Sequence, residues 1–169
     1  MEPVFLQALL HQTVSEIYSV DFEEEPEKDI YSPWQLIIVF QEGDQFLIVE
    51  DAYDGDHIDI RLSPCSQLEN LLTETTEPTL WKPYKTEPTD TLGVLLNGQI
   101  TQLLYAKDKP EFILNGHLLQ GSQRFYTGLK LTCGHNCLTV FSAGVGLFAG
   151  VDSLLLPCFE DTYDWFEVG

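Results

Sequence analysis

Two apolar stretches separated by a short polar one stand out in the first third of the chain. Residues 34–40 and 46–50 are rich in β-branched and aromatic side chains, and the polar stretch 41–45 carries Gly43. This pattern predicts a β-hairpin, because glycine accepts the positive φ angle that a tight turn requires. The first strand is apolar at almost every position, so we expect it in the centre of a sheet, with both faces buried.

The hairpin pattern recurs 91 positions later in the chain. The identical pairs are Gly43 with Gly134, Leu47 with Leu138, Val49 with Val140, Ala52 with Ala143 and Gly55 with Gly146. The stretch 13–20 also resembles 99–106, at a somewhat shorter spacing. We therefore predict two diverged copies of a strand–loop–hairpin unit, related by an approximate two-fold axis.

Signals for the remaining elements are local. Apolar faces with a proline in the first turn predict short helices at 3–12 and 63–74, the second capped by Ser63. An Asn-Gly pair at 97–98 indicates a turn within a strand or hairpin over 92–106, and a second pair lies at 115–116. We interpret the final aromatic and acidic residues, 158–169, as an edge strand.

These elements predict an α+β fold that is mainly antiparallel β. We expect one compact domain in which residues 1–75 form a strongly acidic first repeat and residues 91–169 form a more apolar second repeat. Residues 76–90 contain three prolines and four threonines, which is typical of an extended linker.

Charge separates the two predicted repeats. The chain carries 27 acidic and 8 basic residues, for a net charge of −19. Residues 1–60 contribute 1 − 15 = −14, residues 61–90 contribute 3 − 5 = −2, and residues 91–169 contribute 4 − 7 = −3. Such a field repels nucleic acids and anionic lipid and attracts basic partners, although it also serves simply to keep a surface solvated.

Composition bears on location as well as on fold. Hydrophobic residues make up 44% of the chain, enough for a packed core. The sequence contains no apolar run of the roughly 20 residues that a membrane-spanning helix needs, and its first residues lack the basic start of a secretory signal. We expect a cytoplasmic protein.

Cys133, His135 and Cys137 suggest the start of a zinc site, but a structural site needs four ligands, and Cys65 and Cys158 stand alone. The repeat places Cys133 and Cys137 on either side of a hairpin turn, where cross-strand neighbours could form a disulfide.

The glycine-rich segment 144–150 resembles a phosphate-binding loop but lacks the lysine that such a loop carries. The sequence therefore predicts no metal site and no cofactor.

The acidic loop 51–59 suggests a calcium site, but its twelfth position is Leu62 rather than the glutamate of an EF-hand. A small hydrolase using paired carboxylates, or a divalent-metal-binding protein, remains the alternative function. A homodimer through the second repeat is a further option.

The acidic surface of the first repeat provides the preferred hypothesis. We expect a non-enzymatic binding protein that neutralises or regulates a basic protein, with an immunity-type inhibitor of a toxin or nuclease as its most specific form. Carboxylates opposite Lys and Arg would speed the encounter, and nearby aromatic side chains would anchor the partner. The predicted partner-binding residues are Glu23, Glu24, Glu25, Glu50, Asp51, Tyr53, Asp54, Asp56 and Asp59.

Overall fold

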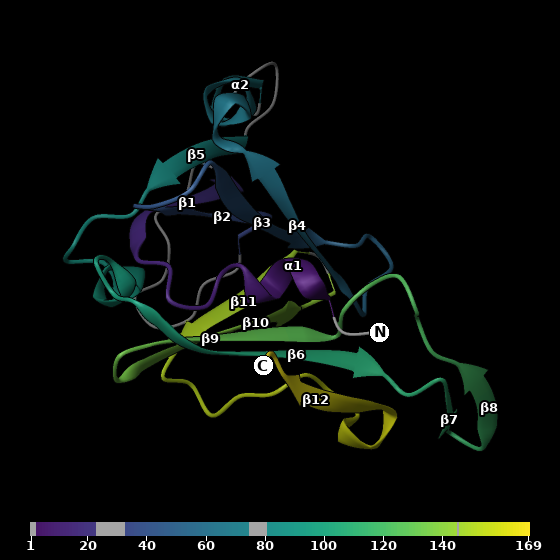
Figure 1. Cartoon of the computed structure of the whole chain (residues 1–169). Helices are drawn as coiled ribbons and strands as arrows, with labels where there is room; N and C mark the ends of the chain where they lie inside the picture. Colours follow the sequence, from purple (N-terminus) through teal and green to yellow (C-terminus); the bar gives the residue numbers. More distant parts are fainter. Residues whose placement is uncertain (1–2, 23–32, 75–80, 145) are drawn as a thin grey trace.

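Two five-stranded antiparallel sheets, stacked face to face, form the body of the molecule, and a two-stranded hairpin projects from one side (Figure 1). This computed structural model describes residues 3–22, 33–74, 81–144 and 146–169. Two α-helices and three short 3-10 helices complete it. The fold is therefore mainly antiparallel β within the α+β class, as the sequence predicts.

The first sheet has the strand order β4-β3-β2-β1-β5. Its strands are β1 (Val14–Phe22), β2 (Gln35–Phe40), β3 (Gln45–Asp51), β4 (Ile58–Pro64) and β5 (Trp81–Lys85). The predicted hairpin is β2 and β3, with Ile37 opposite Ile48. β2 is central and almost wholly buried, as its continuous apolar run predicts.

The second sheet has the strand order β11-β10-β9-β6-β12. Its strands are β6 (Ile100–Asp108), β9 (Gly128–Cys133), β10 (Asn136–Ser142), β11 (Leu147–Val151) and β12 (Tyr163–Glu167). β12 is an edge strand paired with β6, which confirms the expectation for the C-terminal residues. The projecting hairpin consists of β7 (Glu111–Leu114) and β8 (His117–Gln120), joined by the Asn115-Gly116 turn.

The helices are shorter than the sequence predicts. They are α1 (Val4–Gln7), α2 (Leu68–Glu74), η1 (Cys65–Gln67), η2 (Thr91–Leu95) and η3 (Glu160–Thr162). Of the helix expected at 3–12, only α1 is helical. His11 has a positive φ of 71°, which no α-helix accommodates. The helix expected from Ser63 starts later, because β4 continues to Pro64 through pairing with β3.

Two other expectations also differ from the structure. The range 76–90, interpreted as a linker, contains β5, which pairs with β1 and forms an edge of the first sheet. Pro83 is tolerated in β5 because an edge strand leaves one side of its backbone unpaired. Residues 91–95, expected to belong to a strand or hairpin, form η2, and Asn97-Gly98 leads from η2 into β6.

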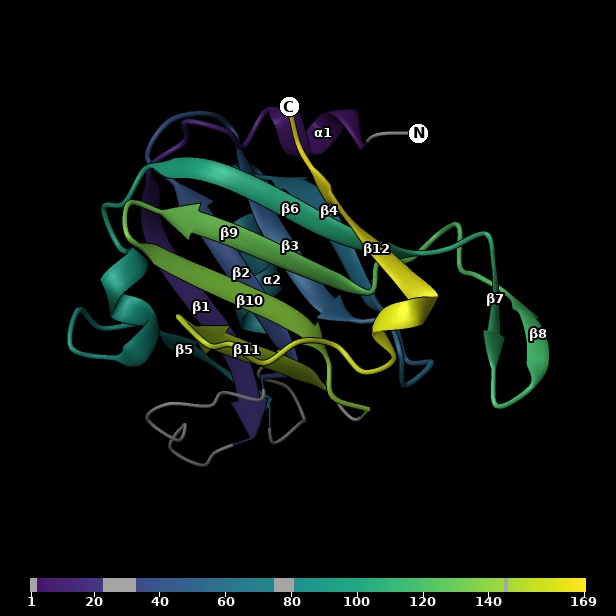
Figure 2. The same ribbon diagram turned by 90° about the horizontal axis from the view of Figure 1, so that it is seen from below.

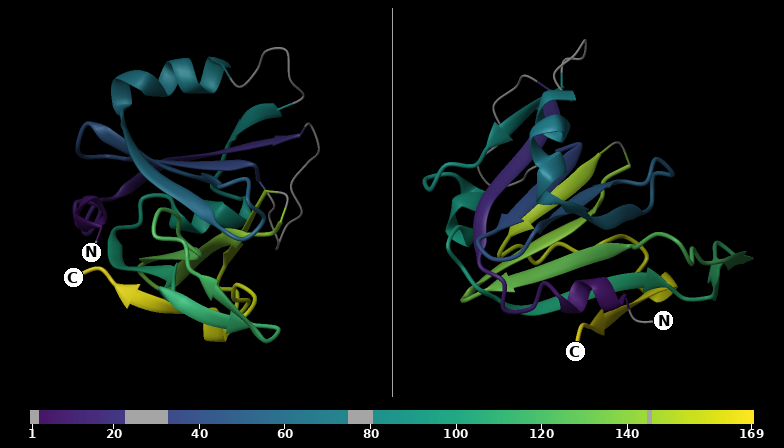
Figure 3. Two further views of the ribbon diagram at one scale, coloured as in Figure 1. Left: turned by 90° about the vertical axis from the view of Figure 1, so that its right-hand side faces the viewer. Right: turned by 45° about the horizontal axis from the view of Figure 1, so that its top comes forward.

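The main core lies between the two sheets (Figure 3, left). It consists of inward-facing side chains from both sheets together with leucines of α1 and η2, such as Leu6 and Leu95, which are fully buried. A second, smaller core lies on the outer face of the first sheet, where Phe46 and Ile48 pack beneath α2. Both faces of the first sheet are therefore covered by apolar contacts.

The two sheets join at a corner where β1 and β6 begin, through reciprocal hydrogen bonds. The Val14 N–H donates to the Gly98 carbonyl at 2.9 Å, and the Ile100 N–H donates to the Gln12 carbonyl at 2.8 Å. A single bridge, Thr13 to Gln99, lies between them. β1 and β6 also both show a register shift directly after this corner.

The cysteines of the second hairpin point away from each other. Cys133 pairs with Asn136, and Cys137 pairs with Thr132. Since paired residues share a face and successive residues alternate, Cys133 and Cys137 lie on opposite faces of the sheet. They do not form the cross-strand disulfide that the sequence left open, and all four cysteines are free thiols. Burial raises the pKa of the Cys133 thiol to about 11.

None of the helices in the described part of the chain has the length and apolar character needed to cross a membrane.

Candidate functional site

The loop between β3 and β4, residues 52–57, contains the most densely connected polar cluster of the structure. Its backbone reverses direction through Tyr53 and Gly55, whose φ angles are 64° and 86°. The Asp54 Oδ1 atom accepts hydrogen bonds from the backbone N–H groups of Asp56, at 3.0 Å, and His57, at 2.9 Å. This is the local turn that aspartate commonly stabilises, and it fixes the position of the His57 ring.

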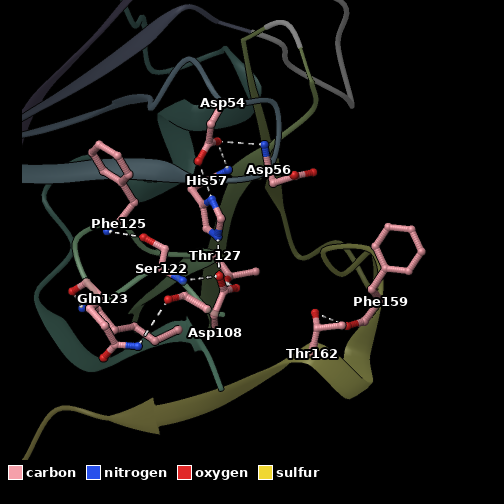
Figure 4. A network of polar contacts seen from close by, with 12 residues as sticks. Asp54, Asp56, His57, Asp108, Ser122, Gln123, Phe125, Thr127, Phe159 and Thr162 are labelled. Atoms are coloured by element: carbon pink, nitrogen blue, oxygen red, sulfur yellow. Dashed lines mark hydrogen bonds and ion pairs between the residues drawn. The ribbon is translucent and has the colours of Figure 1, made fainter. Parts of the chain in front are cut away.

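The His57 ring connects the two sheets (Figure 4). Its Nδ1 atom lies 2.6 Å from Asp54 Oδ2, and its Nε2 atom lies 2.7 Å from Asp108 Oδ2, at the end of β6. Asp108 also accepts hydrogen bonds from the Ser122 N–H, at 2.8 Å, and the Thr127 hydroxyl, at 3.0 Å. We call Asp54, His57 and Asp108 the carboxylate–histidine clamp.

Electrostatics make the imidazole of the clamp a cation. The hydrogen bond to Asp108, joined by that to Asp54, raises the pKa of His57 to about 9 against the opposing effect of burial. Burial alone would raise the pKa of Asp108, but the hydrogen bonds from His57, Ser122 and Thr127 lower it. Only 14% of the His57 side chain and 8% of the Asp108 side chain are exposed, so solvent screens this interaction weakly.

This geometry limits the chemistry of the clamp. A ring with both nitrogens hydrogen-bonded to carboxylates is a double donor and has no free lone pair at neutral pH. A general base needs such a lone pair, together with a pKa near the working pH. The clamp is therefore arranged to hold a proton between the two sheets rather than to transfer one.

The other predicted partner-binding carboxylates of β3 and β4 also have internal partners. Glu50 accepts hydrogen bonds from Arg61 and, at 2.8 Å, from the Gln35 amide. Asp59 lies 3.2 Å from the same guanidinium. Asp51 is only 4% exposed and accepts a hydrogen bond from the Ser142 hydroxyl of β10, at 3.2 Å.

Tyr53, Asp54 and Asp56 are the described members of the predicted set that are exposed, and of these Asp54 is engaged with His57. Tyr53 is 72% exposed and lies edge-on to Trp34, with ring centroids 4.7 Å apart. Asp56 is exposed, and no side-chain hydrogen bond or ion pair joins it to the described residues. The remaining predicted residues, Glu23, Glu24 and Glu25, lie outside the part of the chain that the structure describes.

A hollow at the opposite end of β3 was not anticipated from the sequence. Residues of the segment that follows α1 and of the β2–β3 turn line it, including Leu9, Gln12, Glu42 and Asp44. The Gln12 Oε1 atom is buried and accepts no hydrogen bond from any described residue. Glu42 and Asp44 are exposed, and neither carboxylate has a hydrogen-bond or ion-pair partner within the described ranges. The hollow therefore combines an unsatisfied buried acceptor, Gln12 Oε1, with two exposed carboxylates that have no internal partner.

No known protein family, curated protein or solved structure matches this chain.

Among the described residues, no group of three or more His, Cys, Asp or Glu side chains is arranged to hold a metal ion. The carboxylates that suggested a calcium loop are divided between the clamp, the Arg61 pairs and the buried Asp51.

The sequence analysis did not identify two of the residues that matter most at these sites. Asp108 is 51 positions from His57, and no local signal connects them. Gln12 lies at the end of a predicted helix, and its proximity to the acidic turn depends on how α1 packs beside β2 and β3. Only Glu42 and Asp44 carried a usable signal, as paired acids flanking a turn glycine.

Proposed function

We propose that this protein is a non-enzymatic acidic binding protein that neutralises or regulates a basic protein partner, most specifically as an immunity-type inhibitor of a toxin or nuclease in the cytoplasm. The net charge of −19, concentrated in residues 1–60, supports this function. A field of this strength raises the encounter rate with basic proteins and disfavours nucleic acids.

The observation that carries the proposal is the unsatisfied Gln12 Oε1 atom in the hollow beside the acidic turn. A buried acceptor without a donor, such as Gln12 Oε1, costs free energy that a ligand N–H can recover. Glu42 and Asp44 stand at the rim, exposed and available for an ion pair. A lysine or arginine side chain of a partner matches this combination, because it presents several N–H donors and a positive charge.

The exposed tip of loop 52–57 forms a second contact in the proposal. Tyr53 offers an aromatic surface next to the carboxylate of Asp56, and this pairing is typical of side chains that anchor protein interfaces. Glu50, Asp51, Asp54 and Asp59 contribute their charge to the field, while their hydrogen bonds hold the loop in place.

A capture experiment followed by purified binding tests this function. The protein would be immobilised, exposed to lysate of its own cells at low salt, and the retained proteins identified by mass spectrometry. We expect a basic protein whose purified form binds the native chain directly and more weakly as salt rises, because surface attraction is screened. If the chain also suppresses the activity of that protein, the inhibitor form of the proposal is supported.

Charge reversal then locates the contact. We expect Glu42→Lys with Asp44→Lys to weaken binding about tenfold or more, and Asp56→Lys to weaken it less. The matched control is Asp164→Lys, which changes an equally exposed carboxylate of β12 in the second sheet. An equal loss of affinity in all three variants would mean that only net charge drives binding. No loss of affinity in any variant would mean that neither the hollow nor the loop tip contacts the partner.

The alternative of a carboxylate-based hydrolase or divalent-metal-binding protein gains no support from the described side chains. Four of the five carboxylates of 50–59 that it requires, those other than Asp56, already pair with His57, Arg61, Gln35 or Ser142. Stability measured with and without a chelator tests it, since a resident divalent ion would make unfolding sensitive to the chelator.

We also infer that the chain is an internal duplication with approximate two-fold symmetry. The equivalent strand orders of the two sheets and the reciprocal hydrogen bonds at their corner support this. His11 and Asn97, which enter that corner from either side, both have positive φ angles, of 71° and 62°. Matched truncations of Ile17 and Leu103, which occupy equivalent buried positions on β1 and β6, test the equivalence of the two halves.

A further inference from the structure

The hairpin of β7 and β8, which we call the arm, lies apart from both sheets. It forms a two-stranded sheet of its own and extends away from the body in Figures 1 and 2. Its turn is well formed, since Asn115 and Gly116 both have positive φ angles, of 52° and 80°, as a two-residue hairpin turn requires. An isolated two-stranded hairpin is nevertheless only marginally stable in water.

The arm exposes apolar side chains on both of its faces. Ile113 and Leu118 are opposite each other on one face and are 70% and 64% exposed. Phe112 and Leu119 are opposite each other on the other face, and Leu119 is 40% exposed. Apolar residues grouped in this way on a projecting element are characteristic of an interaction surface.

The register of the arm shows which backbone groups remain unpaired. The Gly121 N–H donates to the Pro110 carbonyl at 2.9 Å, so that pair is hydrogen-bonded. Hydrogen-bonded and non-hydrogen-bonded pairs alternate in an antiparallel ladder. The N–H and C=O groups of Glu111 and Ile113 therefore point outward from β7, and those of Leu118 and Gln120 point outward from β8.

The two edges differ in their accessibility. η3 lies close to β7, whereas in the described part of the chain no strand other than β7 pairs with β8, which forms the outer side of the arm (Figure 1). All four residues of β8 are exposed, while those of β7 alternate between exposed and half-buried. β8 is thus the open edge, and it is available for pairing with another strand.

Charge indicates what can occupy this edge. The arm, residues 111–120, carries one acidic side chain, Glu111, and no lysine or arginine, a net of 0 − 1 = −1 in a chain whose total is −19. A basic partner drawn to the acidic surface finds little attraction here. Two copies of this chain repel each other across most of their surfaces, but they can meet at their arms with little repulsion.

We propose that the arm is a homodimer contact in which β8 of one copy pairs antiparallel with β8 of a second copy. The two hairpins then form one continuous sheet, and the outward backbone groups of Leu118 and Gln120 pair across a two-fold axis. Such an isologous contact closes on itself, so it produces a dimer rather than a filament. It also brings Ile113, Leu118 and Leu119 of both copies into shared apolar faces.

Sedimentation equilibrium of the full chain over a range of concentrations, at moderately high salt to screen the acidic bodies, tests this contact. We expect the native chain to sediment as a dimer. Leu118→Pro removes an outward N–H without removing a bond of the hairpin, and proline is tolerated on edge strands. We expect this variant to dissociate at least about tenfold more readily than the native chain.

The matched control is Ile113→Pro, which makes the same change at the cross-strand partner on the other edge of the arm. We expect this variant to remain a dimer. Near-ultraviolet circular dichroism of each variant checks that the body, which the arm does not enter, stays folded. In the native dimer, the amides of Leu118 and Gln120 should be protected from hydrogen exchange, and those of Glu111 and Ile113 should not.

Three outcomes would overturn the proposal. If the native chain sediments as a monomer at every concentration, the arm does not form a homodimer. A Leu118→Pro variant that dimerises as tightly as the native chain shows that the contact lies elsewhere. Dissociation of Ile113→Pro to the same extent as Leu118→Pro shows that the contact does not use the β8 edge.

Discussion

The loop between β3 and β4 and the loop between β10 and β11 occupy the same place in the strand orders of their sheets, but their side chains differ sharply. Both begin with alanine and include a glycine of positive φ, 86° at Gly55 and 103° at Gly146. Residues 52–57 add two aspartates and a histidine, whereas residues 143–146 carry no charge. The backbone requirement of the turn is shared, and the chemistry is not.

The two loops also contact the opposite sheet in different ways. His57 reaches Asp108 on β6 through an ion pair, while Ser142, just before the second loop, donates to Asp51 on β3 through a single hydrogen bond. Both contacts fasten one sheet to the other. Much of the acidic surface of the first half therefore serves the internal structure, and only a part of it is free of internal contacts.

Truncation of matched core residues should have the largest effect. Ile17 of β1 and Leu103 of β6 are both fully buried between the sheets. We expect Ile17→Ala and Leu103→Ala each to lower the free energy of unfolding by about 2–5 kcal/mol, because each leaves a cavity. Urea denaturation measures both. If only one of the two variants loses stability, the two halves are not packed equivalently.

Removal of the clamp should come next in size. His57→Gln eliminates the cation that neutralises Asp108, and we expect it to lower the free energy of unfolding at neutral pH by about 2–3 kcal/mol. Ser142→Ala is the matched change at the other loop and should cost only about 1 kcal/mol, since it removes one hydrogen bond. Equal losses from the two variants would contradict the difference between the loops.

The clamp also predicts a pH dependence. The pKa of His57 is raised from 6.5 to about 9. Its contribution to the free energy of unfolding is therefore complete below pH 6.5 and disappears as pH rises through 9. The pKa values of Asp54 and Asp108 are lowered, so their contribution is present above 3.8 and is lost as pH falls. Urea denaturation of the native chain between neutral pH and pH 10 should show the alkaline loss, and His57→Gln should not.

Glycine substitutions compare the backbones of the two loops. Gly55 and Gly144 have φ angles of 86° and 88°, and a Cβ atom at either would meet open space. We expect Gly55→Ala and Gly144→Ala each to destabilise the fold by about 1 kcal/mol, because the cost arises from the φ angle alone. Thermal denaturation detects losses of this size. A much larger loss at Gly55 would indicate that the clamp is sensitive to small shifts of its loop.

The smallest effect is expected at the tip of the acidic loop. Asp56 is exposed, so Asp56→Asn should change the free energy of unfolding by less than about 0.5 kcal/mol. Asp54→Asn, two positions earlier, should be clearly destabilising because the ion pair with His57 is lost. If the two variants behave alike in urea denaturation, Asp54 has no structural role distinct from its surface charge.

Sequence patterns anticipated most of the hairpins. The β2–β3 and β9–β10 pairs follow from apolar runs around a turn glycine, and the arm follows from Asn115-Gly116. β5 was missed because its stability comes from pairing with β1 and not from local propensity. The helix at 3–12 was overextended because apolar spacing continues past α1, although His11 turns the chain into β1.

The sequence by itself determined the mainly antiparallel fold, the acidic character and the positions where the chain must turn, because alternation, net charge and glycine placement are local properties. Only the tertiary structure decided which carboxylates are engaged and which are free. Asp54, Asp56 and Asp59 look equivalent along the chain, yet they separate into a clamp, an exposed tip and an Arg61 pair. That division depends on the packing of one sheet against the other, which brings together groups far apart in sequence.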